Sequence, residues 1–208
     1  MPSRKAKREA FVTGLVLGAG GSNRLGRPKQ LLSYGEGTLL GHAVGVARAC
    51  RFDQIVVPIG GAADEVRAQV DLAGTQVVVN HTYGEGCSSS IAAALTVVDP
   101  RCEVIVLMLG DQPGVTPATV AALLGGRGGA PLAVCRYDDA RGHPIAFARD
   151  VFAELADLRG DKAVWKLLDR RADDVADVPV SGCVPLDVDT PQDYQAVLAE
   201  AGWAVTPA

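Results

Sequence analysis

Hydrophobic and polar residues follow one another along this chain in blocks of strand and helix length. Five of the apolar runs are continuous rather than alternating, which is typical of strands that are buried on both faces of a parallel sheet. These runs cover residues 14–17, 54–59, 75–79, 103–109 and 131–136. We therefore expect five strands to form the centre of the fold.

Segments with helical spacing lie between these runs, at residues 38–49, 62–72, 88–98 and 117–124. Thr38, Ser88 and Thr116 are expected to cap three of the helices, with Pro117 at a first helical position. Strands that alternate with helices predict an α/β fold. We expect a single doubly wound, mostly parallel sheet flanked by helices, similar to a Rossmann fold.

The pattern becomes less regular after Tyr137. The stretch YDDARGHPIAFAR is rich in turn residues, and the segments DVFAEL and DKAVWKLLDRR have helical spacing. The pieces DVPVSG and VPLDVDT are expected to be short strands. A closing helix is expected to begin at a Thr190 cap, with Pro191 at its first position and Gly202 as its stop.

Composition restricts the class of protein. The chain has 208 residues, of which 48% are hydrophobic, so one domain over residues 11–208 is expected after a disordered lead-in over residues 1–10. A formal net charge of −4 argues against a general nucleic-acid binder. No apolar run is long enough to cross a membrane. The five cysteines contain no C-x-x-C pair, which fits a reduced cytoplasmic protein without a disulfide scaffold or zinc knuckle.

A glycine-rich, cationic loop, LGAGGSNRLGRPKQLL, begins at Leu17 directly after the first expected strand. Ligands of open α/β sheets bind beyond the carboxyl ends of the strands, where glycines let backbone N–H groups approach a phosphate. Arg24, Arg27 and Lys29 add positive charge. The loop matches neither the Walker A pattern nor the three-glycine dinucleotide pattern. It is either an anion-binding loop of another kind or a solvated basic turn.

Carboxylates that suit a magnesium ion, which prefers oxygen ligands, occur at two places. Asp111 follows the apolar run 103–109 and is expected at the carboxyl end of a central strand, beside the glycine-rich loop. Asp187 and Asp189 alternate along an expected strand and would share one face of it. Asp189 is the preferred second metal ligand, although an aspartate before Thr-Pro also suits a turn or a helix start.

The motifs of this chain resemble those of the MobA-like nucleotidyltransferases. The glycine-rich loop resembles the family signature L-x-A-G-x-S-x-R-M-G-x-x-K-x-L, with Leu25 in place of its methionine. Four later stretches resemble the remaining motifs in the same order: NHTYGEGCSSSI, LMLGDQPGVTPATV, ARGHPIAF and LDVDTPQDY. The match covers nearly the whole chain, and it is most similar to the molybdenum cofactor cytidylyltransferase branch.

This resemblance implies an enzyme that binds a nucleoside triphosphate and Mg²⁺. A phosphate of the acceptor would attack the α-phosphorus, and pyrophosphate would leave. The resemblance gives catalytic roles to Arg24, Lys29 and Asp111, and metal binding to Asp111 and Asp189. It gives nucleotide or acceptor binding to Leu17, Gly18, Ala19, Gly20, Gly21, Asn80, Ser90 and His143.

Two of these residues have another interpretation. Ser90 lies in a serine cluster that also suits a helix cap. His143 is expected on a turn, where it would either bind an acceptor phosphate or order the turn.

Ala19 and Pro28 resemble the cytidylyl branch of the family, which favours CTP over GTP and the molybdenum cofactor as acceptor. The alternatives are a guanylyltransferase and an enzyme of the same fold that acts on a sugar or alcohol phosphate. A further alternative is a non-catalytic carrier that hands the molybdenum cofactor to a molybdenum oxidoreductase. The triphosphate and metal residues named above argue against the carrier, which has no need of them.

Overall fold

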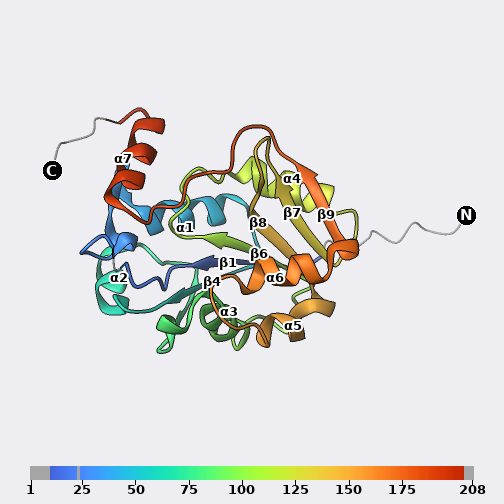
Figure 1. Ribbon diagram of the computed structural model, residues 1–208. Coiled ribbons are helices and arrows are strands. Elements are labelled where there is room, and N and C mark those ends of the chain that lie inside the picture. The colour runs from blue at the N-terminus through green and yellow to red at the C-terminus, as the bar shows by residue number, and fades with distance from the viewer. Residues whose placement is uncertain (1–9, 23, 204–208) are drawn as a thin grey trace, which may run out of the picture.

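The computed structural model describes residues 10–22 and 24–203. Its centre is a seven-stranded sheet with the strand order β5-β4-β1-β6-β8-β7-β9 (Figure 1). The strands are β1 (Val12–Leu17), β4 (Gln54–Ile59), β5 (Gln76–Val79), β6 (Val104–Leu109), β7 (Leu132–Arg136), β8 (Arg141–Ala148) and β9 (Val175–Pro179). β8 runs antiparallel to both of its neighbours, and the other pairs are parallel. The expected mostly parallel α/β sheet is confirmed.

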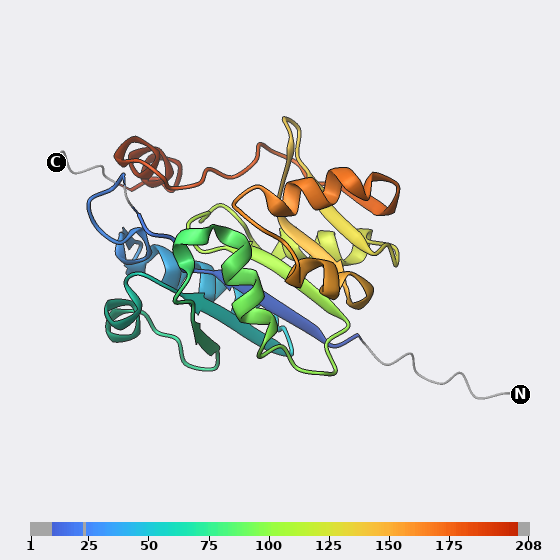
Figure 2. The ribbon, with the colours of Figure 1, turned by 60° about the horizontal axis from the view of Figure 1, so that its bottom comes forward.

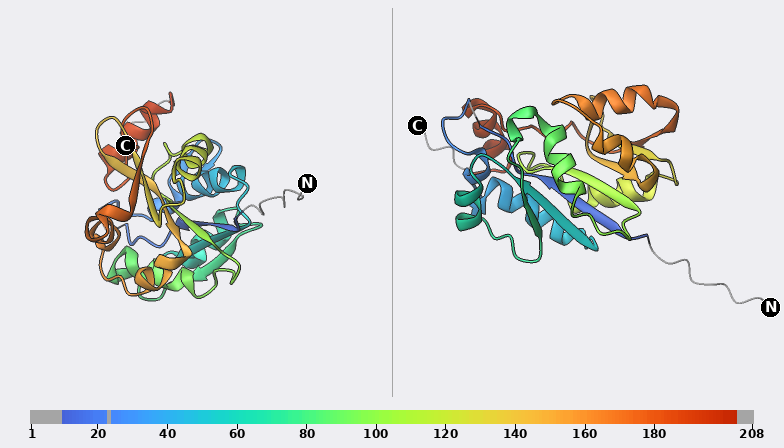
Figure 3. Two further views of the ribbon diagram at one scale, coloured as in Figure 1. Left: turned by 90° about the vertical axis from the view of Figure 1, so that its right-hand side faces the viewer. Right: turned by 90° about the horizontal axis from the view of Figure 1, so that it is seen from below.

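Helices cover both faces of the sheet, as Figure 3 shows from the side and from below. The helices of one face are α1 (Leu39–Ala49), α2 (Ala63–Gln69) and α4 (Pro117–Gly126), and those of the other are α3 (Cys87–Leu95), α5 (Phe152–Ala156) and α6 (Ala163–Arg170). Successive side chains of a strand point to opposite faces, so Val106 packs under the first group and Leu107 under the second. A short hairpin of β2 (Ser33–Tyr34) and β3 (Gly37–Thr38) precedes α1.

All five expected central strands are present, and most helix ends follow the expected residues. The side chains of Thr38 and Thr116 cap α1 and α4. The expected Ser88 cap is wrong, because α3 begins at Cys87 and its N-cap is Gly86, with φ at 98°. This positive φ suits glycine, which has no Cβ to clash with the backbone.

The stretch after Tyr137 is not a run of turns. Only a tight connection separates β7 from β8, and β8 takes up residues 141–148. Gly142 and Pro144 suggested turns, but Pro144 lies where the β7–β8 register shifts between Val134 and Cys135. A bulge tolerates a proline, which has no N–H to give to the ladder, and the rest of the strand is buried.

The expected strand at 184–190 is also wrong. The backbone there crosses the edge of the sheet without a partner strand of its own, and Figure 2 shows it running from β9 back to α7 (Pro191–Glu200). Val188 donates its N–H to the Asp111 carbonyl at 3.0 Å, and Gln112 donates to the Pro185 carbonyl at 2.7 Å. The expected strand at 177–182 overlaps only the end of β9.

Helix α7 has the expected start. Thr190 is its N-cap, Pro191 is its first residue, and Asp193 completes a capping box. Val197 of α7 packs with Leu32, Leu39 and Val188 in a small third core. Helix α7 is thereby held against the segment that follows the glycine-rich loop.

Of the lead-in expected over residues 1–10, the first nine lie outside the described residues. None of the helices in the described part of the chain is both long enough and apolar enough to cross a membrane. The five cysteines are all free thiols, as expected.

Candidate active site

A cleft of about 590 Å³ lies at the carboxyl edge of the sheet. Most of the residues singled out from the sequence line it: Leu17, Gly18, Ala19, Gly20, Gly21, Arg24, Lys29, Ser90, Asp111, His143 and Asp189. They come from loops and strands that are as many as 172 positions apart in the sequence, since Leu17 and Asp189 both line the cleft. The topology therefore gathers these residues at one place.

The glycine-rich loop is held in shape by Gln30, which is almost fully buried. Its side-chain amide donates to the carbonyls of Gly18 at 3.0 Å and Gly20 at 2.8 Å. The Ser22 hydroxyl accepts the backbone N–H of Lys29 at 2.8 Å. The Gln30 bonds occupy two carbonyls of the loop, and together with the Ser22 bond they hold the loop in its conformation beside the cleft.

Gly18 has less room for a side chain than Gly20 or Gly26 of the same loop. A Cβ at Gly18 would lie 3.0 Å from Leu40 and 3.3 Å from the Pro58 carbonyl, so a larger residue would push the loop away from the sheet. The Gly18 N–H itself donates to that carbonyl at 3.0 Å.

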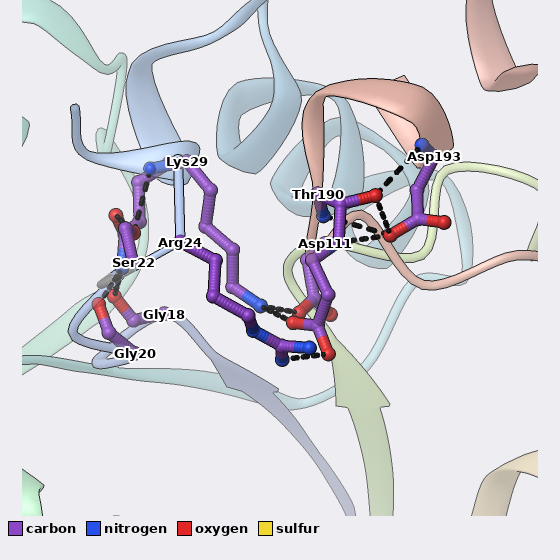
Figure 4. A network of polar contacts seen from close by, with 10 residues as sticks. Gly18, Gly20, Ser22, Arg24, Lys29, Asp111, Thr190 and Asp193 are labelled. Atoms are coloured by element: carbon purple, nitrogen blue, oxygen red, sulfur yellow. Dashed lines mark hydrogen bonds and ion pairs between the residues drawn. The ribbon is translucent and has the colours of Figure 1, made fainter. Parts of the chain in front are cut away.

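Two cations of the loop meet the carboxylates of the cleft. The Lys29 ammonium forms ion pairs with Asp111 and, at 2.9 Å, with Asp189. Arg24 Nη2 lies 2.6 Å from the other Asp189 oxygen. Figure 4 shows the Lys29 side chain extending from the loop toward Asp111, with Arg24 beside it.

Charge and burial set the protonation of this cluster. Burial lowers the pKa of the Lys29 ammonium, but Asp111 and Asp189 outweigh this effect and raise it above its ordinary value. The hydrogen bond from Lys29, together with the charges of Lys29 and Arg24, lowers the pKa of Asp189. Lys29 therefore stays cationic, and Asp189 stays anionic, at neutral pH.

Asp187 lies in the same cleft and differs from Asp189. Burial away from water is the larger cause, and repulsion from Asp111 the second, that raises the pKa of Asp187 to about 6. The cluster thus holds three carboxylates against two cations, and Asp187 has no cation as an ion-pair partner among the described residues. This excess of negative oxygen suits a divalent cation such as Mg²⁺.

The described residues contain no group of three His, Cys, Asp or Glu side chains that converges as a preformed metal site. Lys29 instead supplies the positive charge between Asp111 and Asp189. The donor set fits a divalent metal in its chemistry, because the carboxylates are hard oxygen ligands.

The position of Asp189 depends on the start of α7. Asp193 Oδ2 accepts the N–H groups of Asp189 at 3.1 Å and of Thr190 at 2.7 Å. The interpretation of Asp189 as a helix cap is wrong, because Thr190 is the N-cap and the Asp189 side chain faces the cations. The capping box therefore also orients a carboxylate of the cleft.

Asn80 and Ser90 form a buried pair behind the surface of the cleft. Asn80 Nδ2 donates to the Ser90 hydroxyl at 3.0 Å and to Ser89 at 2.9 Å, while its Oδ1 accepts the N–H of Thr82. Ser90 lines the cleft and lies inside α3, so it is not a helix cap. Asn80 does not line the cleft, and it orders the turn before α3.

His143 is not on a turn. It lies in β8, is buried, and its ring meets Trp165 edge to face with 5.6 Å between centroids. Burial lowers the pKa of His143 to about 4. The ring is therefore neutral at pH 7 in the free chain.

Sequence reasoning missed Gln30 and Trp165 and did not choose Asp187 as a ligand. One sequence feature could have pointed to Gln30, because it is the polar residue that follows Lys29 just before two leucines. No sequence feature pointed to Trp165 as a site residue, since a tryptophan in an amphipathic helix usually belongs to the core.

The model of the MobA-like NTP transferase domain matches residues 14–175 of this chain. The chain belongs to this family. Family membership and fold together support a transferase that acts on nucleotides.

Among the relatives of this chain, nicotine blue oxidoreductase of Paenarthrobacter nicotinovorans is 32% identical over 142 residues, which is 64% of this chain and 69% of that protein. The bifunctional protein GlmU of Burkholderia mallei is 34% identical over 109 residues, or 52% of this chain but only 24% of GlmU.

Solved structures agree with the fold. The homologue of Mycobacterium tuberculosis Rv0371c from Mycobacterium sp. strain JC1 is 52% identical, with a TM-score of 0.88 over 93% of this chain and 98% of that one. Rv0371c itself, solved in complex with manganese, is 49% identical, with a TM-score of 0.82 over 91% of this chain and 98% of that one. A CMP-2-keto-3-deoxy-manno-octonic acid synthetase with CTP shares the fold at 17% identity, with a TM-score of 0.73 over 92% of this chain and 98% of that one.

Proposed function

We propose that this protein transfers CMP from CTP to a phosphate of the molybdenum cofactor and releases pyrophosphate. The observation that carries the proposal is the position of Lys29, whose ammonium lies between Asp111 and Asp189 beside the glycine-rich loop. A cation, carboxylates and exposed backbone N–H groups at the carboxyl edge of a sheet suit a nucleoside triphosphate with a divalent metal.

Arg24 and Lys29 would bind the triphosphate. In the free chain both are paired with Asp189, and Arg24 is mostly exposed, with 65% of its side chain accessible. A triphosphate carries more charge than one carboxylate, so it competes well for these cations. Arg24 offers a planar pair of donors, and Lys29 offers a point charge near the α-phosphate and the leaving group.

Asp111 and Asp189 would hold Mg²⁺, and Asp187 adds a third oxygen donor. The bound metal would neutralise charge on the phosphate oxygens. The manganese in the structure of the relative Rv0371c is in keeping with a divalent metal here.

The reaction requires no covalent step from the protein. An oxygen of the acceptor phosphate forms a bond to the α-phosphorus, the bond from the α-phosphorus to the bridging oxygen breaks, and pyrophosphate leaves with that electron pair. The acceptor phosphate is already ionised near neutral pH, so no general base is needed. The neutral, buried His143 is consistent with this chemistry.

The test is pyrophosphate release with each of the four nucleoside triphosphates and Mg²⁺. The acceptors are molybdenum cofactor, a sugar phosphate and an alcohol phosphate. Release that needs both CTP and the cofactor is the expected result. Release with a sugar or alcohol phosphate alone would assign the enzyme to another acceptor class. Cofactor binding without any binding of CTP–Mg²⁺ would favour a carrier that passes the cofactor to a molybdenum oxidoreductase.

An oxidoreductase is the second candidate, because nicotine blue oxidoreductase belongs among the relatives of this chain. The glycine-rich loop lacks the three-glycine dinucleotide pattern, which counts against it. Oxidation of NADH or NADPH in the presence of nicotine blue, without any pyrophosphate release from triphosphates, would favour this candidate over the transferase.

A further inference from the structure

The cleft has an apolar half that the triphosphate chemistry does not use. Leu17 of β1 and Leu109 of β6 are neighbours in the sheet and line the cleft. Both are only partly buried, whereas Leu15 and Leu107, two residues earlier in the same strands, are fully covered. The apolar floor of the cleft thus stays open to a ligand.

His143 and Trp165 border this floor. His143 lies in β8, the strand next to β6, and its contact with Trp165 of α6 places its ring on the sheet face that Ile145 and Phe147 share. Trp165 and Val164 come from α6, which contacts α3 on the same face of the sheet. The Trp165 ring is partly exposed, and the His143 ring stands at 79° to it.

This contact fixes the Trp165 ring on one side and leaves the cleft side for a ligand. The start of α6 is held in turn by Asp161, whose carboxylate accepts the N–H of Cys87 at 3.0 Å. Burial keeps His143 neutral. Among the described residues that line the cleft, the lysine and arginine are Lys29 and Arg24 of the glycine-rich loop, so the half beside Trp165 has no cation of its own to attract phosphate. A flat, uncharged ring suits such a surface better than an anion does.

The strand order separates this surface from the nucleotide side of the cleft. The glycine-rich loop follows β1, and Tyr83 packs against Gly60 and Gly61 at the end of β4, on the other side of β1. Asp111 follows β6, and His143 lies on β8, one strand further along. The cations and carboxylates therefore lie between the two ends of the cleft. A base on the β4 side would leave the Trp165 side free for the acceptor.

We propose that Trp165 stacks on a planar heteroaromatic ring of the acceptor, and that His143 is a positioning residue that holds the Trp165 ring in place. The inference rests on the proposed function, because it assigns the β8 side of the cleft to the acceptor. Stacking on an aromatic side chain accepts any flat ring face, so the surface selects the ring class and not one compound.

The experiment uses a free oxidised pterin as the probe and measures its own fluorescence, excited where protein does not absorb. A stacked indole quenches that emission. We expect saturable quenching with the wild-type chain, a loss of affinity on the order of ten- to a hundredfold in Trp165→Leu, and partial retention in Trp165→Phe. Trp203→Phe is the matched control, since Trp203 packs near Tyr34 and does not line the cleft.

The thermal shift given by CTP and Mg²⁺ should be the same in Trp165→Leu as in the wild type. Equal pterin affinity in Trp165→Leu and the wild type would overturn the proposal. So would an equal loss of CTP and pterin binding, with Trp165→Phe showing that the fold is intact.

The role of His143 is tested by His143→Leu, which should weaken pterin binding. The double variant should be no weaker than Trp165→Leu, because His143 acts through Trp165. Additive losses would remove the positioning role.

Failure of this inference differs from failure of the proposed function. Pyrophosphate release from CTP without Trp165-dependent pterin binding would reject the ring surface and keep the transferase. Trp165-dependent pterin binding without pyrophosphate release from any triphosphate would keep the ring surface and reject the transferase.

Discussion

Lys29 Nζ lies 2.9 Å from an Asp189 oxygen, although the two residues are 160 positions apart in the sequence. Only 13% of the Lys29 side chain is exposed, whereas 43% of the Asp189 side chain is. The loop after β1 is thus tied to the segment before α7 by a cation that also contacts Asp111. Because the proposed triphosphate would use the same cation, we expect this pair to open or rearrange when nucleotide binds.

Lys29→Ala should reduce turnover far more than nucleotide affinity. We infer that Lys29 acts mainly on charge that develops as pyrophosphate leaves, and loss of one such contact typically costs on the order of 10²–10³ in rate. The measurement is kcat and the nucleotide Kd, compared with Arg67→Ala, a loss of one cation from the exposed face of α2. Activity within a few-fold of wild type would remove Lys29 from the catalytic residues.

Asp111→Asn should abolish metal-dependent activity and keep the fold. Asparagine has nearly the same size but lacks the charge that holds a divalent cation. The measurement is activity against Mg²⁺ and Mn²⁺ concentration, with circular dichroism as the check on folding. Asp173→Asn, an exposed aspartate before β9, is the control. Unchanged metal dependence in Asp111→Asn would move the main metal role to Asp187 or Asp189.

The sheet, and the meeting of the glycine-rich loop and Asp111 at its carboxyl edge, could be predicted from the sequence because both depend on local patterns. Continuous apolar runs mark strands that are buried on both faces, and Asp111 comes directly after one of them. The Thr190 cap and Pro191 fixed the start of α7 in the same way. In these segments the residue types and the tertiary contacts favour the same structure.

The errors came from contacts that are distant in sequence. Pro144 indicated a turn, but the register shift beside it makes room for a proline inside β8. Asp187 and Asp189 flank Val188, whose N–H is bound by the Asp111 carbonyl instead of by a strand. His143 was expected on a turn, but it lies in β8, which pairs with a strand on each side, and its side chain is buried. Alternation of residues along one segment carries no signal for such partners.

Gln30→Leu should weaken nucleotide binding by loosening the glycine-rich loop. Leucine has a similar volume but leaves the carbonyls of Gly18 and Gly20 without their donor. Loss of such bonds from a buried side chain costs about 1–3 kcal/mol. We expect a higher KM for the triphosphate, with kcat changed less, and a lower unfolding midpoint. Gln76→Leu, in the edge strand β5, is the control. An unchanged KM would show that the loop needs no such support.

The stability of the fold should fall as the pH is lowered from about 6.5 to about 4, in part because of His143. Burial lowers the pKa of His143 in the folded chain to about 4, so in this range the unfolded chain binds the proton and the folded chain does not. The contribution of His143 to stability therefore rises with pH across this window. Above the window this contribution no longer changes with pH. The size is on the order of 3 kcal/mol.

The measurement is the free energy of unfolding in urea at pH 4.5, 5.5 and 7 for the wild type and His143→Gln. The variant should be less stable at pH 7, and its stability should fall less steeply toward acid. His81→Gln, at an exposed position after β5, is the control for loss of a histidine. Equal pH slopes in the wild type and His143→Gln would contradict a neutral, buried His143.

CTP should stabilise the protein more than GTP, ATP or UTP does. The basis is Ala19 and Pro28, which resemble the cytidylyl branch, and Ala19 lies buried against the cleft in a loop fixed by Gln30. Backbone groups of a fixed loop recognise the edge of a base, and a wrong base leaves their buried donors and acceptors unpaired. The measurement is the unfolding midpoint with each triphosphate and Mg²⁺. A ligand at 100 times its Kd adds about 2.7 kcal/mol of apparent stability.

A tenfold preference for GTP would place the chain in the guanylyl branch, and a strong preference for ATP or UTP would favour a sugar-phosphate acceptor. In either case the roles proposed for Arg24, Lys29 and Asp111 would remain, because these residues act on the triphosphate and the metal and not on the base.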